Sequence, residues 1–195
     1  REEEFNEYIL NGGFPKTLEF PDINARQVYT RGIIGEIFDK DVRTRKRISN
    51  VPVYERVQSF ILNNYSAPFS ISSLIECLKK EGVSTKPTTV RGYIEELKKA
   101  KIVYECNRFD LKSKRAIKRE QKYYLADLAI YFAMNIDNRL SYGPSLENIV
   151  YLYLASNDYQ ISIGRIGKLE CDFIVRQNVD DYFYIQVAMT IAEQS

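Results

Sequence analysis

Three polar residues in the last third of the sequence have the spacing of ligands for a hard divalent cation. Glu147 lies in an apolar segment with helical spacing, Asp172 in the second of three following strand-like segments, and Gln186 in the third. Hard divalent cations take oxygen ligands from several elements, so these side chains could form one metal site. Polar residues at the ends of helices and strands explain the same spacing without a metal. Spacing alone favours this simpler interpretation.

A second group of residues has the chemistry to contact phosphate. Thr88, Thr89 and Arg91 begin an expected helix, and a loop further along is crowded with basic residues: Lys112, Lys114, Arg115, Lys118 and Arg119. Hydroxyl and basic side chains are the usual partners of nucleic-acid phosphates. A solvated lysine-rich loop is the alternative interpretation. The same alternative is favoured for a further basic cluster: Arg43, Arg45, Lys46 and Arg47.

Composition excludes several classes of enzyme. The 195 residues include no histidine, so His-based triads, His-ligated zinc and a histidine general base are absent. No G-x-x-x-x-G-K-[ST] or G-x-G-x-x-G motif occurs, so this chain lacks the usual phosphate-binding loops. Lys and Arg number 28 against 26 Asp and Glu, so any basic surface must be local. Cys77, Cys106 and Cys171 are too far apart for a zinc motif and indicate a reducing compartment.

The middle of the chain has the element order of a winged helix-turn-helix. Helices are expected over residues 53–64 and 72–80, followed by a third helix that begins near Pro87 and then by strands over 102–109 and 121–125. The third helix should bury one stripe of residues, Val90, Tyr93, Ile94 and Leu97, and expose a polar face that includes Glu95 and Glu96. Expected helix caps are Ser73 with Glu76, and Ser84 or Thr85.

Further elements are expected on both sides of this module. Before it, the pattern predicts helices over residues 4–10 and 24–41, the second with a buried face of four residues: Val28, Ile33, Ile34 and Ile37. After it come a buried helix over 126–134 and a loop over 141–144. A helix over 146–155 and strands over 160–164, 170–175 and 181–189 complete the chain.

Six short motifs in this order resemble the C-terminal half of a large prokaryotic family of predicted AAA-type ATPases. The motifs cover nearly the whole chain: Tyr8-Ile-Leu-Asn-Gly-Gly-Phe-Pro15, Thr89-Val-Arg-Gly-Tyr-Ile-Glu-Glu-Leu97, Lys122-Tyr-Tyr-Leu-Ala-Asp127, Leu146-Glu-Asn148, Cys171-Asp-Phe173 and Tyr184-Ile-Gln-Val187. In that family an N-terminal P-loop ATPase domain precedes a domain of unknown function. That domain consists of a winged helix and a segment similar to PD-(D/E)XK nucleases.

The resemblance implies an α+β fold with three parts. Residues 1–50 would be a helical linker after an absent ATPase domain, 51–140 the winged helix-turn-helix domain, and 141–195 a truncated α/β nuclease-like domain. Glu147, Asp172 and Gln186 would then be a degenerate metal site, because Gln186 stands at an acidic position of the motif and Ala188 at its lysine position. ATP and Mg²⁺ would belong to the absent domain, with no cofactor in this fragment.

Three functions therefore follow as expectations. In the first, the chain is a non-catalytic accessory region that binds nucleic acid through the winged helix and its basic loop. In the second it is a metal-dependent nuclease that uses Glu147 and Asp172. In the third it only mediates protein contacts that assemble the ATPase. The expected partners are nucleic acid, the protein's own ATPase domain and further copies of the chain, in the cytoplasm and without a membrane.

Overall fold

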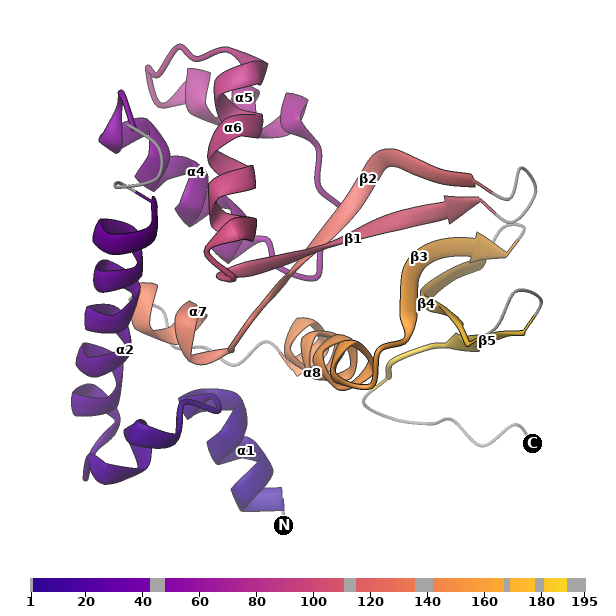
Figure 1. Cartoon of the computed structure of the whole chain (residues 1–195), viewed down its shortest axis with the longest axis horizontal. Coiled ribbons are helices and arrows are strands. Elements are labelled where there is room, and N and C mark those ends of the chain that lie inside the picture. The colour runs from indigo at the N-terminus through magenta and orange to yellow at the C-terminus, as the bar shows by residue number, and fades with distance from the viewer. Residues whose placement is uncertain are drawn as a thin grey trace. The chain divides into compact units, whose positions relative to one another are not determined.

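The computed structural model describes residues 2–42, 48–110, 115–135, 142–166, 169–177 and 181–188. The fold is α+β, with helices and a five-stranded mixed sheet among these residues (Figure 1). The chain forms two compact units. Unit 1 comprises Arg1–Asn64, Ser70–Tyr104 and Leu125–Leu140, and unit 2 comprises Tyr65–Phe69, Glu105–Tyr124 and Ser141–Ser195.

One part of unit 1 is built around a long helix. Helix α1 (Glu2–Asn11) is followed by the 3₁₀ helix η1 (Pro15–Glu19) and by α2 (Ile23–Ile37), which continues as the π-helical turn η2 (Phe38–Val42). The short helix α7 (Ala129–Met134) packs against both α1 and α2. The helices predicted in these three regions are therefore present, although the last begins three residues later than expected.

The buried face of α2 differs from the prediction. Thr30 and Ile34 are buried, whereas Val28, predicted to be buried, is 65% exposed. The face that meets α7 is marked by Arg31, whose side chain donates a hydrogen bond to the Ala133 carbonyl at 2.9 Å. Val28 precedes Thr30 by two residues and so lies roughly 160° away around the helix. The apolar stripe read from the sequence was therefore placed on the wrong side at its N-terminal end.

A glycine turn after α1 packs directly on the residues that begin α7. Gly12 has a φ of +70°, and a side chain there would collide with the Asp127 carboxylate. The backbone N–H of Gly13 donates to Asp127 Oδ2 at 2.8 Å, and the N–H of Ala129 donates to Oδ1 at 2.8 Å. Glycine is needed here for both its backbone conformation and its lack of a side chain. The turn is thus a docking point between segments over 100 residues apart in sequence.

The rest of unit 1 is a group of three helices. Helix α6 (Pro87–Lys99) packs against both α4 (Val51–Asn63) and α5 (Ile71–Lys80), which also contact each other (Figure 1). All four apolar residues predicted to line α6 are buried, and the Tyr93 ring meets the Tyr54 ring edge-on at 5.5 Å. Glu96 was predicted to be exposed but is only 4% exposed, because it lies one turn after Tyr93, at the edge of the buried face.

The caps predicted for α5 and α6 were wrong. Helix α5 is capped by Ser70, whose side chain accepts from the Ser73 N–H at 3.1 Å, so the helix starts before the predicted pair Ser73 and Glu76. Helix α6 has Lys86 at its N-cap position and no side-chain cap. Pro87 occupies its first turn, where a missing N–H is tolerated, and this leaves Ser84 and Thr85 outside the helix.

Unit 2 is organised around the sheet, with strand order β2-β1-β3-β4-β5. The strands are β1 (Val103–Asp110), β2 (Arg115–Leu125), β3 (Gln160–Ile166), β4 (Leu169–Arg176) and β5 (Tyr182–Ile185). Strand β1 pairs in parallel with β3, whereas β3, β4 and β5 form an antiparallel meander. Strand β2 starts six residues before its predicted beginning, so part of the predicted basic loop is strand.

Helix α8 (Tyr142–Ser156) covers the sheet through an aromatic stack. The ring of Tyr151 lies 4.2 Å from that of Tyr124 at an interplanar angle of 8°, and Phe173 packs on both. The first turn of α8 includes part of the loop predicted over 141–144. A proline is tolerated in such a first turn, and Ser66 Oγ donates to the Pro144 carbonyl at 3.0 Å.

A short extended segment between α4 and α5 also joins the β structure of unit 2. The N–H groups of Ser66 and Phe69 donate to the carbonyls of Tyr123 and Gln121 at 2.8 and 2.9 Å, and Pro68 forms an antiparallel bridge with Lys122. The segment between the first two helices of the module is therefore paired with β2. None of the helices in the described part of the chain is long and apolar enough to cross a membrane.

Candidate functional site

The most distinctive polar site of unit 2 is centred on the Glu147 carboxylate of α8. Glu147 Oε1 accepts from Lys122 Nζ at 2.7 Å and from the Tyr124 hydroxyl at 2.6 Å. Both donors lie on β2, two residues apart, as expected for neighbours on one face of a strand. The Lys122 and Glu147 side chains are only 14% and 13% exposed. The structure therefore holds a largely buried ion pair between a strand and a helix.

Burial dominates the electrostatics of this site. It raises the pKa of Glu147, and the neighbouring charge of Asp172 raises it further, whereas the bonds from Lys122 and Tyr124 oppose the rise. The pKa of the Tyr124 hydroxyl is also raised, first by burial and then by Glu147. On β1, burial raises the pKa of the Cys106 thiol to about 12. Tyr124 and Cys106 therefore keep their protons at neutral pH, and neither provides an anionic nucleophile.

Asp172 and Gln186 form a separate hydrogen-bonded pair. Asp172 Oδ2 accepts from the Gln186 side-chain amide at 2.7 Å and from the Val187 N–H at 2.8 Å. The structure thus brings Asp172 and Gln186 into contact, while Glu147 is linked to Asp172 through charge. Lys122 was not identified from the sequence as a site residue. Its alternation with Tyr124 on a strand was visible, but nothing local indicated a carboxylate partner 25 residues away.

The donor set fits a divalent cation poorly. Gln186 presents an amide nitrogen to Asp172, and the Lys122 ammonium group already lies on Glu147. Magnesium is usually held by one or more carboxylates that are free to reach it. Within the described ranges, no group of three or more His, Cys, Asp or Glu residues is placed to hold a metal. We therefore derive no metal-dependent step from Glu147, Asp172 and Gln186.

The second candidate surface is the polar side of helix α6. Thr88 and Arg91 are exposed and Thr89 is partly exposed. Both glutamates of the helix are paired with lysines one turn later. Lys98 Nζ lies 2.9 Å from Glu95 Oε1, and Lys99 Nζ lies 3.1 Å from Glu96 Oε1. The carboxylates are thus locally neutralised, and the exposed cations near the start of the helix include Arg91 and the N-cap residue Lys86.

The predicted basic loop is only partly covered by the structure. Arg115, Lys118 and Arg119 belong to strand β2. Lys112 and Lys114 lie outside the described residues, as does the whole of the other basic cluster, Arg43, Arg45, Lys46 and Arg47. The contribution of these side chains to a binding surface stays a prediction.

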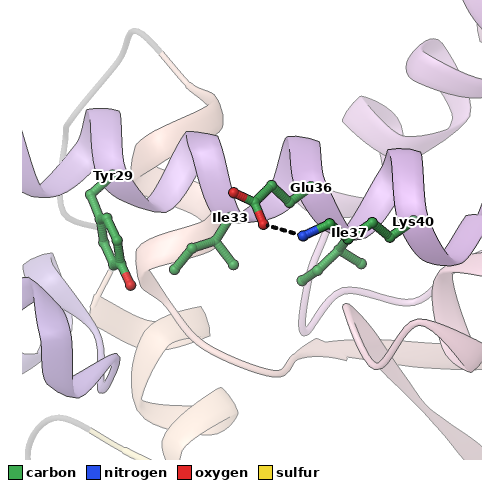
Figure 2. Close-up of a pocket in the computed structure, with 5 residues that line it drawn as sticks. All are labelled: Tyr29, Ile33, Glu36, Ile37 and Lys40. Carbon is green, nitrogen blue, oxygen red and sulfur yellow. Dashed lines mark hydrogen bonds and ion pairs between the residues drawn. The ribbon is translucent and has the colours of Figure 1, made fainter.

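A third feature is an open pocket beside α2 and η2 in unit 1. Its volume is about 300 Å³, and it is lined by Tyr29, Ile33, Glu36, Ile37 and Lys40. Figure 2 shows the three apolar side chains on one side of the helix, one turn apart, with the Glu36–Lys40 ion pair running along the same helix at 2.8 Å. The lining offers apolar contact and one neutralised pair, which is typical of a packing surface more than of a catalytic site.

Comparison with known proteins places most of the chain in one family. Residues 2–140 match a domain of unknown function, DUF8612. An uncharacterized protein of Haemophilus influenzae is 27% identical over 191 residues, which are 98% of this chain and 47% of the relative. Uncharacterized protein MJ1544 of Methanocaldococcus jannaschii is 26% identical over 180 residues, 92% of this chain and 38% of the relative.

The chain thus spans less than half the length of these relatives. No solved structure matches it significantly. The family match includes the helices of unit 1 and strands β1 and β2, and ends before α8. The chain belongs to the DUF8612 family, a family defined by a domain of unknown function.

Proposed function

We propose that this chain is a nucleic-acid-binding region of a longer protein and performs no catalysis itself. The observation that carries the proposal is the charge balance of α6. The two glutamates on this helix, Glu95 and Glu96, would repel phosphate if their charges were not balanced. Each is paired with a lysine on the same helix, and Glu96 is buried as well. The repulsive groups are therefore neutralised, while Arg91 is exposed.

The element order supports a winged helix as the binding module. Three helices are followed by two strands, and the segment between the first two helices pairs with the second strand. In helix-turn-helix proteins the recognition helix presents its N-terminal residues to base edges, and flanking elements contact the backbone. Helix α6 would take the first role through Thr88, Thr89 and Arg91. Strand β2 and the loop before it would supply phosphate contacts through five residues: Lys112, Lys114, Arg115, Lys118 and Arg119.

The longer protein is proposed to contain an ATPase domain of the AAA type. The relatives are more than twice as long as the segment they share with this chain, so they have room for a domain of that size. ATP and Mg²⁺ would bind in that domain, since this chain has no phosphate-binding loop. The winged helix would then direct the ATPase to nucleic acid, with further copies of the chain as partners in the assembly.

The first test is the removal of one charge from α6. Arg91→Ala should weaken binding to a duplex oligonucleotide by several-fold and reduce the slope of log K against log salt by about one unit, because one phosphate contact is lost. Lys16→Ala is the matched control: it also removes one positive charge, but from η1, where Lys16 lies 4.0 Å from Glu19. Equal effects of both substitutions would show that only net charge matters and would count against α6 as the docking element.

A further inference from the structure

We propose that the ammonium group of Lys122 occupies the place beside the Glu147 carboxylate that a divalent cation would otherwise take. In this role Lys122 is a positioning residue that fixes strand β2 on helix α8. The inference concerns the interior of unit 2. It goes beyond the proposed nucleic-acid binding and does not depend on it.

The first argument is the geometry at the Glu147 carboxylate. Lys122 Nζ and the Tyr124 hydroxyl both donate to the same oxygen, at 2.7 and 2.6 Å. An ammonium group is a compact point charge with three donors, and it requires no fixed coordination geometry. It can therefore balance the charge of a carboxylate in place of a metal ion. Charge-assisted bonds of this length are among the strong hydrogen bonds of proteins. The carboxylate therefore has a cation and a neutral donor already in contact with it.

The second argument is the charge that surrounds the pair. Glu147 is largely buried, and a second carboxylate, that of Asp172, lies close enough to act on it electrostatically. Asp172 itself receives only neutral donors in the described structure, from Gln186 and Val187. Among the described side chains, these two carboxylates thus share the positive charge of Lys122. Without Lys122 both negative charges would remain in a partly buried region, and an external cation would be the simplest source of compensation.

The third argument is the position of Lys122 within the fold. It lies on β2 opposite Pro68, in the stretch where the segment between α4 and α5 pairs with this strand. Two residues later Tyr124 stacks on Tyr151 of α8. The ion pair and the aromatic stack therefore join the same strand to the same helix.

The experiment compares four proteins: wild type, Lys122→Met, Glu147→Gln and the double variant. Thermal unfolding is followed with and without Mn²⁺, and Mn²⁺ binding is measured directly from the electron paramagnetic resonance signal of the free ion. Lys122→Met should lower Tm by roughly 10 °C, because it leaves a buried carboxylate without its partner. Mn²⁺ at ten times its Kd should restore on the order of 4 °C to this variant. Mn²⁺ should leave the Tm of the wild type and of the double variant unchanged.

Lys122→Arg is the conservative control and should stay close to wild type in Tm and in its lack of response to Mn²⁺, since it keeps a cation beside Glu147. Wild-type protein that binds Mn²⁺ at a site lost in Glu147→Gln would overturn the inference, and this comparison holds even if Lys122→Met does not fold. A Lys122→Met protein with an unchanged Tm would also overturn it. So would one that is destabilised but gains no Mn²⁺ binding, because Lys122 would then be an ordinary ion-pair partner.

Discussion

At the scale of single residues, the partly buried carboxylate of Asp127 shows how local chemistry joins distant segments. It accepts from the N–H groups of both Gly13 and Ala129, and it lies against a glycine that tolerates no side chain. Burial raises its pKa, while the two backbone hydrogen bonds act in the opposite direction. A carboxyl group whose folded pKa is raised binds protons more readily in the folded state. Its ionised form therefore costs stability at neutral pH, and the cost falls as the pH falls.

We predict that Asp127→Asn changes the pH dependence of stability. At pH 7 the variant should lose about 1 kcal/mol, since its amide keeps one acceptor but turns an NH₂ group toward the second backbone N–H. The pKa of Asp127 in the unfolded chain is about 3.9, and its pKa in the folded protein is higher. As the pH falls from the folded toward the unfolded pKa, the wild type should gain stability relative to the variant. Urea unfolding between pH 7 and 4 measures this difference. A difference that is constant or shrinks on acidification would contradict the assignment.

The burial and contacts of a residue were predictable from the sequence where they depend on its neighbours along the chain. The apolar stripe of α6 was correct at Val90, Tyr93, Ile94 and Leu97, since helical periodicity alone determines it. The pairing of Lys122 with Glu147 was not predictable, because it depends on how β2 meets α8. The positions of Glu95 and Glu96 were visible, but their pairing with Lys98 and Lys99 was overlooked, although an i, i+3 spacing could have indicated it.

At the scale of elements, helices α4, α5 and α6 were located well and their ends poorly. The cap of α5 is the clearest case: the N-cap is Ser70 and not Ser73, and the Ser70 side chain accepts a hydrogen bond from the Ser73 N–H. Both serines had suitable chemistry, and the choice depends on where the preceding extended segment ends. That segment is held by its pairing with β2, which no local signal in the sequence reveals.

We predict that Ser70→Ala lowers the free energy of unfolding by about 1 kcal/mol, the usual cost of losing an N-cap. Ser72→Ala is the matched control, because Ser72 is an exposed serine in the first turn of the same helix. It should change stability by less than about 0.5 kcal/mol. Chemical unfolding of both variants provides the comparison. Equal losses would show that the cap lies elsewhere.

At the scale of the whole molecule, the α+β class and the order of helices and strands were predictable from the sequence. The sheet was harder to anticipate, because the parallel pairing of β1 with β3 joins strands that are about 50 residues apart. It makes β1 and β2 part of the same sheet as β3, β4 and β5, whereas the sequence suggested two separate domains that meet near residue 140. Parallel pairing across a long connection leaves no short-range signal.

For the longer protein, we predict a division of labour. This chain alone should neither bind nor hydrolyse ATP, because it lacks the loop of backbone N–H groups and the following Lys-Ser/Thr pair that hold phosphates. A full-length relative should do both. Calorimetry with ATP and a phosphate-release assay on both proteins check this. ATP turnover by the chain alone, or a full-length relative inactive toward ATP, would contradict the proposed ATPase partner.

The central claim is that the chain binds nucleic acid through charge carried by α6 and the basic segment before and within β2. Its most direct test is a titration of a labelled duplex at several salt concentrations, with wild type and with the variant Lys114→Ala/Arg115→Ala/Lys118→Ala. Four neutralised phosphates predict a slope of log K against log salt of about −3.6 for wild type, and the variant should make that slope shallower by about two to three units. An unchanged slope and affinity in the variant, or no binding by wild type even at low salt, would contradict the claim.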